Sequence, residues 1–122
     1  MSKAERVYED LIVWQQARAL ARDIYHITQG KPFSEDHVLR EELRNAVDRI
    51  VINIMKGAEQ GSQIEFARYL MEAHSACALL SSTLQLATDL GFVSDDRYRR
   101  IMRQMITTNN TLNKLKDQVS RA

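Results

Sequence analysis

Few side chains in this sequence could perform catalysis or bind a metal ion, and their spacing matches no familiar motif. The chain has one cysteine, Cys77, and three histidines, His26, His37 and His74, which fall in different segments with no i, i+4 histidine pair. A metal site needs converging ligands of defined geometry. The sequence therefore predicts neither a metal ion nor a cofactor.

Carboxylates and the thiol give no better candidate for catalysis. Glu65 and Glu72 flank Arg68 at helical spacing, which is typical of ion pairs on a helix surface. Cys77 lies within an apolar stripe, where burial raises the pKa of a thiol and lowers its reactivity. No glycine-rich phosphate loop, nucleophile elbow or histidine-based triad is present. We therefore predict that the chain is not an enzyme, unless a site is shared between subunits.

The last quarter of the chain is basic. From Ser94 to Ala122 there are seven basic and three acidic residues, whereas the remainder has ten basic and thirteen acidic ones. Such a face could bind phosphate backbones with salt-dependent affinity, or it could be solvated or paired with acidic surfaces of neighbouring subunits. No aromatic residues interleave with the basic side chains, which weakens stacking on single strands. The candidate nucleic-acid contacts are Arg99, Arg100, Arg103, Lys114 and Arg121.

Length and composition predict one domain spanning residues 1–122. A chain of 122 residues with 44% apolar residues and a net charge of +1 suits a single globular core, and it does not suit a protein whose whole surface binds polyanions. A single cysteine excludes a disulfide scaffold and fits a reducing compartment. No apolar run approaches the roughly 18 residues of a membrane span. We therefore expect a cytoplasmic protein that does not contact membranes.

Glycine and proline divide the chain into four segments, each with apolar residues at helical spacing. Four amphipathic helices with short connections predict an all-α fold, an antiparallel up-down-up-down four-helix bundle. The predicted helices span approximately residues 10–29, 34–60, 62–90 and 94–120.

Local signals mark the predicted helix starts. Asp10 could accept an unpaired backbone N–H of the first helix, and Ser62 with Glu65 forms a capping-box pattern. The second helix is predicted to start near Ser34 and the fourth at Ser94, and acidic residues follow each of them in the first turn. The stretch of residues 107–111, TTNNT, has low helix propensity. Fraying or a kink is therefore expected there.

The motif YEDLIVWQQA, residues 8–17, resembles the opening signature of small bacterial four-helix-bundle proteins named after 23S rRNA intervening sequences. Residues 53–57, 62–70, 89–92 and 112–115 resemble later parts of that family. The resemblance implies a four-helix bundle that assembles as a homopentamer and has no established enzymatic activity.

The chain departs from that family's pattern at four positions. Met55 and Lys56 stand where members usually have alanine and glutamate, and Leu79 and Ser81 stand where members tend to carry glutamates. The surface of the third helix should therefore be more apolar here.

Apolar residues outside the core stripes predict self-association. A bundle helix needs one apolar stripe, and a surplus on adjoining helices would exceed what monomers usually expose. We expect a self-assembling, non-enzymatic interaction protein whose partner is itself; the alternatives are a loosely packed monomer and a nucleic-acid-binding accessory protein. The candidate interface residues are Ile12, Ile52, Met55, Leu79 and Leu86.

Overall fold

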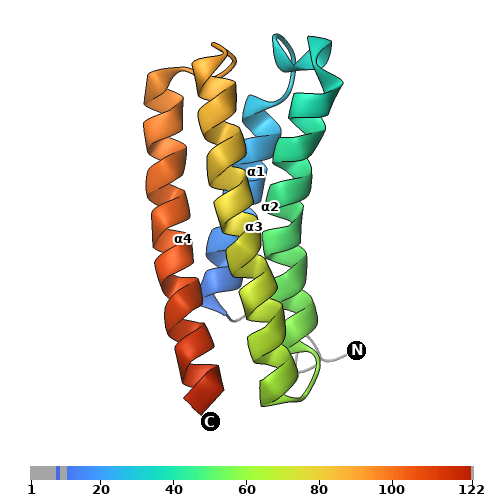
Figure 1. The fold of residues 1–122 in the computed structure, drawn as a ribbon, viewed down its shortest axis with the longest axis vertical. Coiled ribbons are helices and arrows are strands. Elements are labelled where there is room, and N and C mark those ends of the chain that lie inside the picture. The colour runs from blue at the N-terminus through green and yellow to red at the C-terminus, as the bar shows by residue number, and fades with distance from the viewer. Residues whose placement is uncertain (1–7, 9–10, 122) are drawn as a thin grey trace.

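The computed structural model describes Tyr8 and residues 11–121, and within this part it contains helices and no strand. The four α-helices are α1 (Ile12–Ile27), α2 (His37–Ala58), α3 (Gln63–Asp89) and α4 (Asp95–Arg121), and a short 3-10 helix, η3 (Phe33–Glu35), precedes α2. Successive helices run in opposite directions, so α1 begins and α4 ends at the same end of the molecule (Figure 1). The α1–α2, α2–α3, α3–α4 and α1–α4 pairs are in contact. The predicted four-helix bundle is confirmed.

Apolar residues at intervals of three and four form the core, as helical periodicity requires. Each helix contributes one stripe, and the stripes meet along the bundle axis. The large side chains with no exposed surface include Leu20, Ile24, Leu43, Ile50, Ile54, Leu70, Leu80, Leu84, Ile101 and Leu112.

Two helices start where the sequence predicts them. The Ser62 Oγ accepts the backbone N–H of Glu65 at 3.3 Å before α3, and the Ser94 Oγ accepts the backbone N–H of Arg97 at 3.2 Å before α4. Gly91 follows α3 with a φ of 81°, the left-handed conformation that glycine adopts without strain.

The predicted start of the second helix at Ser34 is wrong. Ser34 lies within η3, and α2 begins at His37. The capping residue is Asp36, whose Oδ1 accepts the backbone N–H of Leu39 at 3.0 Å. Both residues have side chains suited to capping, and the buried Phe33 anchors the preceding turn so that Asp36 occupies the N-cap position.

Asp36→Ala should lower the free energy of unfolding by about 1 kcal/mol, because it removes the acceptor for an N–H at the start of α2. Ser34→Ala should change the free energy of unfolding by less than about 0.5 kcal/mol, since Ser34 is exposed and lies outside α2. Urea unfolding followed by circular dichroism measures both. Equal losses for the two variants would contradict the assignment of Asp36 as the cap.

The start of α1 differs from the prediction. Asp10 lies outside the described residues, and α1 begins at Ile12 with Leu11 in the N-cap position and no side-chain cap. The helix ends at Ile27, and α2 ends at Ala58, each two residues short of its predicted end. Such differences are usual at helix ends, which fray.

The expected fraying of the low-propensity stretch in α4 is absent. The helix runs without interruption from Asp95 to Arg121. The hydroxyl groups of Thr107, Thr108 and Thr111 donate to the carbonyl oxygens four residues before them. Thr108 is buried, so packing outweighs the weak local preference.

An aromatic pair joins two of the connections. The rings of Phe33, before α2, and Phe92, after α3, pack edge to face with centroids 5.2 Å apart, a favoured aromatic geometry. The two connections at that end of the bundle are therefore held together.

Candidate functional site

The outward side of α3 is unusually poor in charge. Between Glu72 and Asp89 the helix contains no Asp, Glu, Lys or Arg over more than four turns. The exposed fractions are 60% for Met71, 40% for Leu79 and 51% for Leu86. We call this surface the α3 outer face, made up of Met71, Ser75, Ala78, Leu79, Ser82 and Leu86.

The predicted interface residues reach the surface but do not form one patch. Ile12, Ile52, Leu79 and Leu86 are exposed, and Met55 is half-buried. Ile12 lies away from the others, in a groove at the α1–α4 seam. The groove between α2 and α3 has a volume of about 510 Å³ and is lined in part by charged side chains, namely Arg49, Arg68 and Glu72.

The structure adds exposed apolar residues that the sequence analysis missed. Met71 lies one heptad before Ala78 and belongs to the α3 outer face. Ile106 of α4 is 55% exposed and lies beside α3, because it lines the same cavity as Ala78. Extending the outward-facing positions of α3 back by four residues from Ser75 would have found Met71. The position of Ile106 depends on how α4 packs against α3.

Of the three histidines, only His74 lies beside Cys77. His37 Nδ1 is 2.7 Å from an Arg40 guanidinium nitrogen, His26 is exposed, and His74 Nδ1 is 2.9 Å from Asn109 Oδ1. Burial raises the pKa of the Cys77 thiol to about 11, so the thiol is neutral at physiological pH. In the described part of the chain, no three His, Cys, Asp or Glu side chains come together as a metal site.

The candidate basic residues separate into two groups. Arg99 pairs with Asp96 at 2.5 Å, and Arg121 Nε donates to the Asp117 carbonyl oxygen at 3.3 Å, so both are engaged within α4. The other three, Arg100, Arg103 and Lys114, are exposed and have no ion-pair partner among residues 11–121.

These three residues lie along the seam between α1 and α4. Arg100 and Arg103 line a groove of about 400 Å³ together with Gln16 and Gln104, and Lys114 lines a second groove of about 360 Å³ beside the start of α1. We call this surface the basic seam, made up of Arg100, Arg103 and Lys114.

Two amide oxygens beside the basic seam lack hydrogen bonds. Gln104 Nε2 donates to Asp23 Oδ2 at 2.6 Å, which orients the amide and leaves Gln104 Oε1 buried and without a partner in the described structure. Gln16 Oε1 is also buried without one. A buried acceptor without a donor costs free energy. A partner or water molecule that donates an N–H or O–H group to these oxygens would remove that cost.

A family model described as 23S rRNA-intervening sequence protein matches residues 9–114. The chain belongs to this family. No curated protein matches the sequence. The match covers α1, α2, α3 and most of α4. It therefore includes the α3 outer face and all three residues of the basic seam.

Leu79 and Ser81 have different structural settings in this 23S rRNA-intervening sequence protein. Leu79 lies on the α3 outer face and is exposed. Ser81 turns toward α4, where its Oγ donates to Met102 Sδ at 3.6 Å. Leu79 therefore contributes to the outer face, and Ser81 contributes to the contact with α4.

Helices able to cross a membrane are not found among the described residues. Although α3 lacks charged residues over several turns, its serine, threonine and glutamine residues keep its hydropathy below that of a membrane span.

Proposed function

We propose that this 23S rRNA-intervening sequence protein is a non-enzymatic module that assembles with copies of itself through the α3 outer face. The observation that carries this proposal is the exposure of Met71, Leu79 and Leu86 on α3, of which Leu79 and Leu86 lie in a stretch without charged residues, 73–88. Surface helices usually present charged side chains to water. A large apolar patch with polar surroundings is typical of a protein interface.

The occupant of this face is a second copy, because two segments of one chain carry opposite net charge. Its last segment has a surplus of four basic residues, and the remainder has a surplus of three acidic ones. A contact in which different faces of two copies meet is heterologous, and such contacts form a ring when the rotation between copies closes. This geometry agrees with the homopentamer that the family resemblance implies.

Assembly would supply function through multivalency. Each copy presents the same exposed helix faces, so several weak contacts to one partner add through a high effective concentration. The mechanism needs no cofactor and no catalytic residue.

Sedimentation equilibrium at micromolar concentration tests the proposal. The expected mass is a multiple of the 14.1 kDa of one chain, five times that mass for a pentamer. A species of 14.1 kDa alone at that concentration would overturn the assembly.

A second candidate function is nucleic-acid binding through the basic seam. It is favoured by one observation: three exposed cationic side chains follow one seam without ion-pair partners in the described residues. Contacts to phosphates supply affinity without sequence specificity. Duplex backbones are the expected ligand, because no aromatic side chain lies between these cations for base stacking.

Arg100→Ala combined with Arg103→Ala should weaken duplex binding at about 50 mM salt and reduce the salt dependence by about two counterions per chain. Filter binding with RNA and DNA duplexes measures both effects. Arg49→Ala with Lys56→Ala is the matched control, because it removes two exposed cations from α2. Absence of binding by the natural chain would exclude this function.

A further inference from the structure

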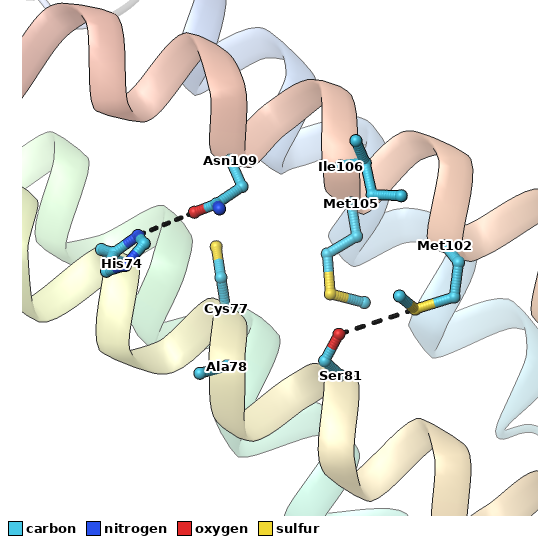
Figure 2. A pocket seen from close by; sticks show the side chains of 8 residues that line it. All are labelled: His74, Cys77, Ala78, Ser81, Met102, Met105, Ile106 and Asn109. Atoms are coloured by element: carbon cyan, nitrogen blue, oxygen red, sulfur yellow. Dashed lines mark hydrogen bonds between the residues drawn. The ribbon is translucent and has the colours of Figure 1, made fainter.

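A small cavity between α3 and α4 gathers three sulfur atoms and an imidazole. It has a volume of about 130 Å³, and its lining includes Cys77 and His74 from α3 and Met102 and Met105 from α4. Figure 2 shows the thiol and both thioethers directed into the space between the two helices, with His74 at one end. His74 and Cys77 are three residues apart and so share one face of α3.

Neighbouring polar groups position these side chains. His74 Nδ1 lies 2.9 Å from Asn109 Oδ1. With the amide oxygen as acceptor, Nδ1 carries the ring proton and Nε2 of the neutral ring keeps its lone pair, an arrangement common for metal-bound histidines. The Ser81 Oγ donates to Met102 Sδ at 3.6 Å and holds that thioether beside the cavity.

This donor set suits a soft metal ion. Thiolate and thioether sulfurs select Cu(I), whereas Ca²⁺ and Mg²⁺ prefer oxygen ligands. No carboxylate lines the cavity. The cavity therefore lacks the ligands of a hard cation and has those of a soft one.

Charge balance further restricts the ion. None of the lining residues is Asp, Glu, Lys or Arg, and the thiol of Cys77 is buried. A monovalent ion bound to one thiolate forms a neutral pair, whereas a divalent ion would leave a net positive charge in a site with no acidic side chain. Burying an unpaired charge is costly, so the cavity favours a monovalent ion.

We propose that this cavity binds one Cu(I) ion, with Cys77 Sγ and the thioethers of Met102 and Met105 as ligands and His74 Nε2 as a further donor. Binding forms a bond between copper and Cys77 Sγ and breaks the S–H bond, and the proton leaves to solvent. Copper stays monovalent, so no oxidant or reductant is needed. The proposal is independent of self-assembly, since its ligands come from one chain.

Anaerobic titration with Cu(I), in competition with the chromophoric chelator bathocuproine disulfonate, tests the site. The natural chain should bind one ion per chain and release one proton. Loss of one thioether in Met105→Leu should weaken binding by about 10-fold or more, and Cys77→Ala by more than about 100-fold. Met71→Leu, which changes an exposed methionine on the same pair of helices, should bind as the natural chain does.

The methionine variants keep the test decisive even if Cys77→Ala unfolds, because leucine replaces methionine with little change in volume. Circular dichroism confirms that each variant is folded. Cu(I) affinity that is unchanged in both Met102→Leu and Met105→Leu would show attachment to a bare thiol and overturn the site. Binding of less than one ion per natural chain, or an equal loss in Met71→Leu, would also overturn it.

Discussion

A chain carrying Leu79→Glu together with Leu86→Glu should sediment as a single 14.1 kDa protein at micromolar concentration, where the natural chain is expected to assemble. Both positions are exposed on α3, so glutamate, a good helix former, should leave the bundle folded. A carboxylate buried in an interface without a partner is strongly unfavourable. Since about 1.4 kcal/mol changes a dissociation constant tenfold, we expect the double variant to weaken assembly by more than about 100-fold.

The control carries the same added charge on another helix. Asn110→Glu with Gln118→Glu places two carboxylates at exposed positions of α4 and should leave the sedimented mass unchanged. An assembly that survives glutamate at Leu79 and Leu86 would show that the α3 outer face is not the contact. Circular dichroism of both variants distinguishes dissociation from unfolding.

Gly57→Ala should destabilise the fold although alanine favours helices. Gly57 is buried in α2, and a Cβ there would lie 2.8 Å from Tyr69 Cβ and 2.9 Å from Phe66 Cδ1. The phenyl ring could shift, but Tyr69 Cβ is fixed by the backbone of α3. Overpacking costs about 1–3 kcal/mol, and the gain in helix propensity offsets about 1 kcal/mol of it.

The expected net loss of up to about 2 kcal/mol is measured as a lower urea midpoint at unchanged slope. Asn45→Ala is the matched control, because Asn45 is exposed in the same helix. That variant should gain up to about 0.7 kcal/mol from helix propensity alone. A Gly57→Ala protein as stable as the natural one would show that α2 and α3 can separate at this contact.

Local signals in the sequence predicted most of the fold. Ser62 caps α3 as expected, because a capping bond spans only three residues. The choice between Ser34 and Asp36 could not be made locally, since both side chains can cap and the burial of Phe33 depends on the whole bundle. Residues 107–111 stay helical for the same reason, as packing of Thr108 overrides weak propensity.

The surfaces were less predictable than the fold. Helical periodicity placed Leu79 and Leu86 outside the core, and the structure leaves both exposed. It could not show that Leu79 lines a groove with charged side chains of α2 and α3, because that depends on how the two helices are aligned. The same holds for Cys77, which the sequence predicted only as part of an apolar stripe, and for its neighbour Met105. Their shared cavity follows from the register of α4 against α3.

The arrangement of the helices gives the bundle two unlike poles. One pole has the start of α1, the α2–α3 connection and the end of α4, and the other has the two connections joined by Phe33 and Phe92 (Figure 1). A fluorescent or affinity tag attached after α4 would therefore sit at the first pole. The long sides of the helices and the aromatic pole would stay clear of it.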